Sequence, residues 1–302
     1  MDTKKSLKIA LFACFVSTAG ITLTPGTLQA DTIAYALPGS TFGTVDLNTG
    51  IYTPTTTTGA GQAQGLGVYN GNLYGDDHQF TDLIQINPTT GAVTSAPTPY
   101  NLNEAGFGST TAGLFLIQAG TPTNLYSINP TTGAATLIGP TGITAGGGNG
   151  ALSVSNDSGA LYWAVQSLSV AGEWSLYSLN TSTGAATLLG TTLDNPNAGG
   201  PGLGDGEVNA LLLEGGTLWA EFGNNTGPTI GTINTTNAAA TVLEAESQTG
   251  GGQQNFVGLA PDPLSPTSPP PTVPEPATLA LLGAGLGAIG LLRCFRSSAA
   301  RR

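Results

Sequence analysis

Short apolar stretches alternate with polar turns through the middle of the chain, and the alternation repeats. Five stretches run into a similar phrase, in which a strand-forming segment leads to Asp or Asn and then to a turn: residues 42–50 (FGTVDLNTG), 83–91 (LIQINPTTG), 125–133 (LYSINPTTG), 176–184 (LYSLNTSTG) and 230–238 (IGTINTTNA). Their polar anchors, spaced 41, 42, 51 and 54 residues apart, are Asp46, Asn87, Asn129, Asn180 and Asn234. Self-similarity at such a period indicates a fold built from repeated units of short strands.

Each repeat predicts four strands. In the third phrase, residues 125–128 and 134–138 have strand patterns, and the segment from Asn129 to Gly133 separates them. Asn tolerates turn dihedrals, Pro fixes φ and Gly supplies positive φ, so the phrase predicts a β-hairpin. Another strand pair precedes each of the last four phrases, over residues 65–74, 107–115, 151–162 and 208–219. Four strands per repeat are typical of a propeller blade.

The ends of the repeat region complete the count of strands. One strand pattern precedes the first phrase, at residues 32–37, and one follows the last phrase, at residues 255–260. Joining the last strand to the first three would complete a blade and cover open sheet edges. We therefore predict an all-β fold over residues 31–261: a five-bladed β-propeller with four-stranded blades, whose ring is closed by the C-terminal strand.

One aromatic residue recurs at the same place in four repeats, directly after a Leu: Tyr74, Phe115, Tyr162 and Trp219. We expect these rings to pack between neighbouring blades rather than to form a sugar-stacking platform. Trp174 lies outside this register in a longer insertion, so it is the better candidate for an exposed ring.

The amino end has the layout of a secretory signal peptide. Residues 1–8 carry positive charge, residues 9–21 are apolar, and residues 28–30 (LQA) form a small-residue cleavage site. We predict that residues 1–30 are removed on export. A lipoprotein box with an acylated Cys14 is the alternative.

The carboxyl end predicts a spacer followed by a membrane anchor. Residues 262–276 are rich in Pro, Ser and Thr, which favours an extended linker. As a helix, the apolar residues 277–292 would reach about 24 Å at ~1.5 Å per residue, close to a hydrocarbon core of roughly 30 Å. We predict a transmembrane helix at 277–292 and a basic cytoplasmic tail at 293–302.

All seven basic residues lie at the two ends of the chain. They are Lys4, Lys5, Lys8, Arg293, Arg296, Arg301 and Arg302. Lys and Arg hold their flank of an apolar segment on the cytoplasmic side, so the four arginines are the predicted stop-transfer charges. Seventeen carboxylates lie between Asp31 and Glu275, where there is no Lys or Arg. Such a domain repels phosphate backbones, which excludes nucleic-acid binding, whereas neutral glycans remain accessible.

The last thirty residues resemble a known sorting signal. Val273, Pro274, Glu275 and Pro276 precede a Leu/Gly/Ala-rich segment and a terminal Arg cluster, as in the PEP-CTERM tail of exported Gram-negative bacterial proteins. The resemblance implies that these four residues are the motif recognised by an exosortase, a membrane-embedded Cys protease and transpeptidase, in a host that makes extracellular polysaccharide and forms biofilms or flocs. The basic cluster is interrupted by other residues, and an uncleaved C-terminal anchor is the alternative.

The acidic residues are the candidates for chemistry. Asp76 and Asp77 stand with His78 and Asp82 in one predicted loop, and Asp205 with Glu207 in another. Paired carboxylates can hydrolyse glycosides, but the domain has one His and no Lys or Arg, so we expect solvated loop acids and no enzyme. Hard oxygen ligands of the kind that Ca²⁺ uses are supplied by Asp76, Asp77, Asp82 and Asp205, but no known loop spacing is present, and we predict no metal or other cofactor.

These observations favour an exported, non-enzymatic protein of the cell surface or extracellular matrix. It would be anchored in the inner membrane by its C-terminal helix, with the domain outside the cytoplasm, until an exosortase-like protease processes the tail. Its candidate ligands are neutral glycans or matrix proteins. A secreted propeller hydrolase acting on glycans is the alternative function.

Overall fold

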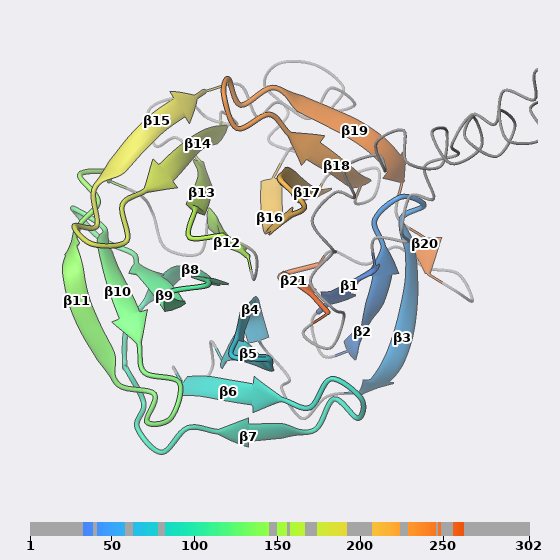
Figure 1. The fold of residues 1–302 in the computed structure, drawn as a ribbon, viewed down its shortest axis with the longest axis horizontal. Helices are drawn as coiled ribbons and strands as arrows, with labels where there is room; N and C mark the ends of the chain where they lie inside the picture. The colour runs from blue at the N-terminus through green and yellow to red at the C-terminus, as the bar shows by residue number, and fades with distance from the viewer. Residues whose placement is uncertain are drawn as a thin grey trace, which may run out of the picture. The chain divides into compact units, whose positions relative to one another are not determined.

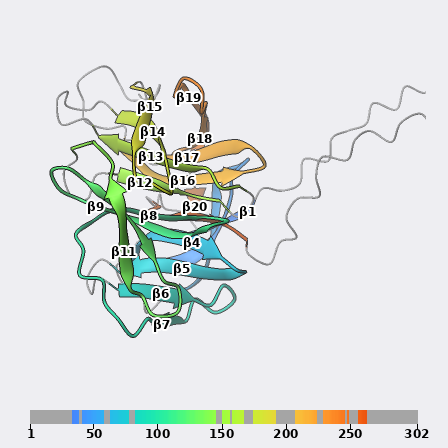
Figure 2. The ribbon, with the colours of Figure 1, turned by 60° about the vertical axis from the view of Figure 1, so that its left-hand side comes forward.

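Among the residues that the computed structural model describes, all regular secondary structure is β-strand (Figures 1 and 2). The structure describes residues 33–38, 41–57, 63–77, 82–144, 150–155, 158–166, 174–191, 207–223, 229–245, 247–248 and 256–262. Within those ranges, no helix is long and apolar enough to cross a membrane. The predicted signal peptide, transmembrane helix and basic tail lie outside the described residues, as does the linker beyond residue 262. The all-β class is confirmed.

The strands pair as antiparallel groups of four. Group 1 is β21 (Leu259–Pro261), β1 (Ile33–Ala36), β2 (Thr41–Asp46) and β3 (Ile51–Thr57). Group 2 is β4 (Ala63–Tyr69), β5 (Asn72–Asp77), β6 (Asp82–Ile86) and β7 (Val93–Ser95). Group 3 is β8 (Glu104–Thr110), β9 (Gly113–Gln118), β10 (Asn124–Ile128) and β11 (Ala135–Pro140). Group 4 is β12 (Gly150–Val154), β13 (Leu161–Gln166), β14 (Trp174–Leu179) and β15 (Ala186–Gly190). Group 5 is β16 (Glu207–Glu214), β17 (Thr217–Gly223), β18 (Thr229–Ile233) and β19 (Ala240–Ala245).

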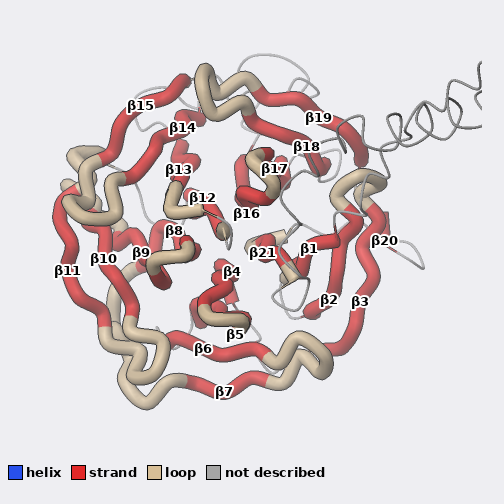
Figure 3. The backbone as a smooth tube through the Cα atoms, in the orientation of Figure 1, coloured by secondary structure: helices blue, strands red, loops and turns tan. Residues whose placement is uncertain are grey.

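The first strand of each group lies near the middle of the view, and the fourth lies at the rim (Figures 1 and 3). Each inner strand contacts the next, in the order β21, β4, β8, β12, β16 and back to β21. Val154 of β12 pairs in parallel with Ser109 of β8, and the Ser109 hydroxyl accepts a 2.8 Å hydrogen bond from the backbone N–H of Val68. The arrangement is propeller-like, although hydrogen bonding joins the strands into three sheets rather than one closed ring.

The last strand pairs with the first. Ala36 is opposite Leu259 and Ala34 is opposite Pro261, so β21 supplies the inner strand of group 1 as the sequence predicted. Its observed start is later than the predicted residue 255, and the segment before it is tied to Leu37 through backbone hydrogen bonds of 3.0 Å and 3.2 Å. One short strand was not predicted: β20 (Ser247–Gln248) pairs in parallel with β3 on its outer edge.

The repeated phrase forms the hairpin between the third and fourth strands of each group. At Asn129, the side-chain oxygen accepts hydrogen bonds from the backbone N–H groups of Thr131 (2.9 Å) and Thr132 (3.0 Å). The N–H of Gly133 donates to the Asn129 carbonyl at 2.8 Å, and Gly133 has a φ of 79°. The same side-chain bonds recur at Asn87 and Asn180, which confirms the predicted turn.

These turns also hold neighbouring groups together. A Cβ on Gly133 would lie 2.5 Å from the carbonyl oxygen of Thr98, in the connection from β7 to β8, and one on Gly184 would lie 2.4 Å from the Gly139 carbonyl oxygen of group 3. In the fifth phrase, Ala238 replaces the glycine at a φ of 58° and faces Gly190. At Gly133 and Gly184 the glycine thus permits the close contact as well as the turn, and in the fifth phrase Ala238 takes that place.

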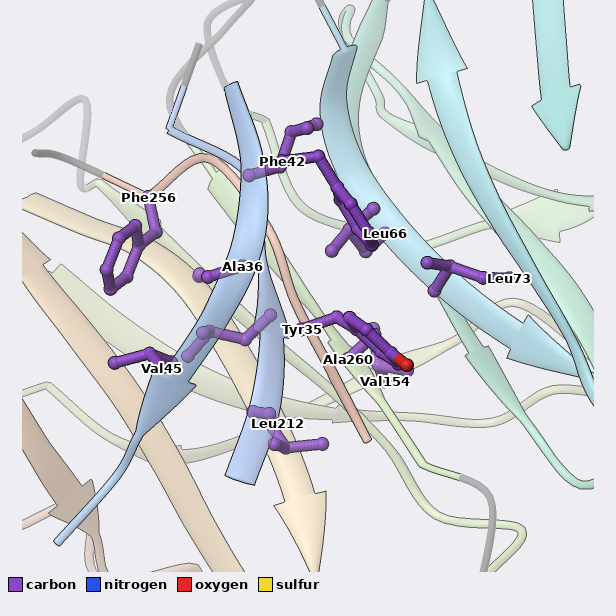
Figure 4. Close-up of a cluster of buried hydrophobic side chains, with 14 of the residues drawn as sticks. Tyr35, Ala36, Phe42, Val45, Leu66, Leu73, Val154, Leu212, Phe256 and Ala260 are labelled. Carbon is purple, nitrogen blue, oxygen red and sulfur yellow. The ribbon is translucent and has the colours of Figure 1, made fainter. Parts of the chain in front are cut away.

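Apolar side chains from neighbouring groups form the core. One cluster joins residues of β1, β2, β4, β5, β12 and β16 with Phe256 and β21 (Figure 4); within it, the Tyr35 and Phe42 rings stack at 5.2 Å. The recurring aromatics lie in such clusters, with Tyr162 half-buried and the other three buried, which confirms their packing role. The prediction for Trp174 was wrong: it is 4% exposed, because it begins β14 and packs in a cluster with residues of β16 and β17.

Candidate functional site

Three of the acids singled out in the sequence lie together in group 2. Asp76 and Asp77 end β5, and Asp82 begins β6 opposite Asp77. The expectation of solvated loop acids was wrong for the first two, since Asp76 is 1% exposed and Asp77 is 7% exposed. The physical reason is that β5 continues through Asp77 and carries both residues into the packed region. His78 and Asp205 lie outside the described residues.

Glu104 joins this group, and sequence reasoning missed it. It is the first residue of β8 in group 3 and is 5% exposed. Its neighbour is Asp76, which lies in the adjacent group. The only sequence signal was an isolated acid at the start of an apolar strand, and nothing local in the sequence links it to Asp76.

Burial changes the protonation of this acid pair. It raises the pKa of the Asp76 carboxyl to about 8, with help from the charges of Asp77 and Asp82, and Glu104 opposes part of the rise as a hydrogen-bond partner. Burial followed by the charge of Asp76 raises the pKa of Glu104 well above its usual range. Neither oxygen of Asp76 has a partner of ordinary hydrogen-bond geometry. Two ionised carboxylates repel each other and can only accept hydrogen bonds, so the raised pKa values favour a proton on one carboxyl of the pair.

The described carboxylates of this group form no grouping that could hold a metal ion. Among the described residues, no three His, Cys, Asp or Glu side chains are grouped so that they could hold a metal ion. Asp76, Asp77 and Asp82 are brought near one another, yet they lack the arrangement of oxygens around a common point that Ca²⁺ uses.

A second buried acid occupies the same position of the repeat as Asp76. In each group, the residue just before the polar anchor pairs with a residue of the second strand. Three positions further along the chain from that partner lies the position compared here. Its residues in groups 1 to 5 are Leu37, Asp76, Ile117, Ala164 and Glu221. We call this the acid position. Glu221 is 0% exposed there.

The surroundings of Glu221 disfavour its charge. Burial raises the pKa of its carboxyl well above the usual range, the charge of Glu207 adds to the rise, and Asn209 and the backbone of Phe256 oppose it. Neither of these polar neighbours forms a hydrogen bond of ordinary geometry with the carboxyl oxygens. Burial without a hydrogen-bonded partner therefore favours the neutral form of the Glu221 carboxyl over its charged form.

A small pocket opens where the inner strands meet. Its lining comes from β4, β8, β12, β16 and the segment that enters β21, including Gly65, Phe107, Gly150, Asn209 and Gly258. None of the described residues that line it is charged, so the buried acids do not face this pocket. Glycine permits the close approach there, since a Cβ on Gly258 would lie 2.8 Å from the backbone nitrogen of Leu66.

The tail matches a family of sorting signals. Residues 272–297 match the PEP-CTERM protein-sorting motif. The chain carries a PEP-CTERM sorting motif. The motif indicates an exported protein that is sorted and processed by exosortase, a membrane protease. Residues 273–276, Arg293 and Arg296 fall inside the match, while Arg301 and Arg302 follow it; all of them lie outside the described residues, and their individual roles remain predictions.

No curated protein matches this chain. Among solved structures, the chain is similar to one in the nidogen/laminin complex, with 14% identity, a TM-score of 0.48, and coverage of 76% of this chain and 81% of that chain. It is also similar to TolB from Acinetobacter baumannii, with 12% identity, a TM-score of 0.43, and coverage of 72% and 54% of the two chains.

Proposed function

We propose that this protein is a non-enzymatic component of the cell surface or extracellular matrix of a polysaccharide-producing bacterium. The PEP-CTERM motif at residues 272–297 carries the proposal. The exported part would be a five-bladed β-propeller over residues 31–261. Its support is the five four-stranded groups, whose inner strands contact one another in a closed order.

The proposed route has three steps. Residues 1–30 direct export and are removed. The helix at 277–292 then holds the protein in the inner membrane, with residues 293–302 in the cytoplasm and the propeller on the other side. Finally, exosortase acts near Val273, Pro274, Glu275 and Pro276 and releases or transfers the domain to the surface or matrix.

The proposed ligands are neutral glycans or matrix proteins. No Lys or Arg lies between Lys8 and Arg293, so His78 is the one side chain of the domain that could carry a positive charge toward an anionic ligand. Hydroxyls are plentiful instead: the fourth strand of each group exposes a Thr at the same register, namely Thr53, Thr94, Thr136, Thr187 and Thr241. A hydroxyl both donates and accepts hydrogen bonds, as the hydroxyls of a neutral sugar do.

Intact mass and cell fractionation test the sorting route. We expect the mature protein outside the inner membrane to lack residues 1–30 and everything from Arg293 onward. Glu275→Ala should leave the protein in the membrane fraction at full C-terminal length, whereas the linker control Pro266→Ala, outside the matched residues, should be processed normally. Mature protein that still contains Arg293 would contradict the proposal.

A glycan hydrolase is the second candidate function, and the Asp76–Glu104 pair favours it. A carboxyl whose pKa is raised by burial can act as a general acid beside a second carboxylate. Incubation of the purified domain with a panel of glycans decides between the two functions. Hydrolysis that is lost in both Asp76→Asn and Glu104→Gln would establish the hydrolase, and binding without hydrolysis would support the structural role.

A further inference from the structure

Glu221 is a buried acid without any cation that could neutralise it from within the domain. Its side chain is fully buried, and both oxygens lack a hydrogen-bond partner of ordinary geometry. Buried carboxylates are usually paired with Lys or Arg, but the chain has neither between Lys8 and Arg293. Three of the five groups fill the same position with Leu37, Ile117 and Ala164, so the fold itself does not require an acid there.

Glu221 lies where group 5 meets the segment that completes group 1. In the pairing of β16 with β17, Glu221 is opposite Ala210, next to the bulge that contains Asn209. Across the junction it meets the backbone of Phe256, three residues before β21. Phe256 is 0% exposed, and its ring lies 5.3 Å from the ring of Tyr52 in group 1. Segment 256–261 thus bridges the two groups; Figure 4 shows its residues Phe256 and Ala260 in one apolar cluster with Val45 of β2 and Leu212 of β16.

We propose that Glu221 is a proton-operated latch: in its neutral form it keeps segment 256–261 seated between groups 5 and 1, and on ionisation it releases that segment. The switch takes up or loses a single proton and needs no other reactant.

The charges around Glu221 set the direction of the switch. Glu207 of β16 is the charged group that acts on it, and it is also acidic. The facing residues from the other packed elements, Ile230 of β18 and Phe256 of the bridging segment, carry no charge. An ionised Glu221 would therefore be buried beside like charge and without a counterion, and outward movement of segment 256–261 is the way to admit water.

Hydrogen exchange of segment 256–261, corrected for the intrinsic pH dependence of exchange, tests the latch. In the wild-type domain we expect protection of the backbone N–H groups of this segment to fall at least about tenfold between about pH 5 and about pH 9, while the hairpin of β10 and β11 keeps its protection. Glu221→Gln, which keeps the shape and cannot ionise, should hold the protection constant. Asp46→Asn is the control, because it also removes one negative charge and places at this anchor the residue found at the other four. Its protection should change with pH as that of the wild type does.

The proposal is overturned if wild-type protection does not change with pH, or if Glu221→Gln loses it to the same extent. Carboxyl carbon-13 NMR, with the Glu221 signal assigned by its loss in Glu221→Gln, is a second measurement. We expect that carboxyl to titrate well above the ordinary Glu range near 4.3. Titration of Glu221 within that ordinary range would also overturn the latch.

Discussion

The rim turns and the acid position are both repeated five times, but they repeat in different ways. At the rim, Asn or Asp anchors every turn, and the turns at Gly133, Gly184 and Ala238 lie against the part of the chain that precedes them. At the acid position, three groups have an apolar residue and two have a buried carboxyl. The difference shows that the rim chemistry builds the fold, whereas the acids of groups 2 and 5 are additions that the fold accommodates.

Transferring an acid to group 3 tests this comparison most severely. Ile117 is 0% exposed at the acid position and packs in an apolar cluster, so Ile117→Glu places a carboxyl among apolar side chains. We expect a loss of about 3–5 kcal/mol in the free energy of unfolding at neutral pH. Urea unfolding measures it, with Ile117→Val as the control at about 1 kcal/mol. A loss as small as that of the control would mean that every group accepts an acid.

The pH dependence of stability tests the protonation of the buried acids. Burial raises the pKa of Asp76 from 3.8 to about 8 and shifts those of Glu104 and Glu221 in the same direction. The unfolded chain therefore releases these protons first: the stabilisation is complete below about pH 4 and is lost as the pH rises through about 8.

Urea unfolding across this window should show stability falling by about 1.4 kcal/mol per pH unit for each such group. Asp76→Asn should have a shallower slope than the wild type. Stability that increases with pH over the same window would show that the buried acids are ionised in the folded protein.

Gly184→Ala tests the rim. The residue has a φ of 82°, and the new Cβ would lie 2.4 Å from the Gly139 carbonyl oxygen. We expect a loss of about 2–3 kcal/mol, from backbone strain together with separation of groups 3 and 4. Gly142 has a φ of 79° and open space around it, so Gly142→Ala isolates the strain alone, at about 1 kcal/mol. Equal losses in the two variants would show that the turn does not dock.

The smallest effect is expected at the one rim turn that lacks glycine. Ala238 has a φ of 58°, so Ala238→Gly relieves a left-handed conformation, although it adds freedom to the unfolded chain. We expect a net gain of about 0.5 kcal/mol, measured as a higher urea midpoint. A loss would mean that the contact of the Ala238 methyl group with Gly190 outweighs the strain.

The sequence predicts best what is decided locally. The hairpin at Asn129 follows from residues that lie next to one another, and so does the tail motif at residues 272–297. The pairing of Asp76 with Glu104 and the burial of Trp174 depend on packing between distant strands, for which hydrophobic pattern carries no signal. Asp76 and Asp77 were misread because two acids before a His look like a loop, and only the continuation of β5 buries them.

The pairing of β21 with β1 also sets the timing of folding. Ribosomes make β1 among the first residues of the domain and β21 last, so the contact of Ala36 with Leu259 joins nearly the two limits of the domain. Such distant contacts form slowly, because a long loop has to close before they can stabilise anything. Until then, group 1 has an open inner edge on which a foreign strand could pair. We therefore expect the protein to be most exposed to aggregation and proteolysis in the interval before β21 pairs with β1.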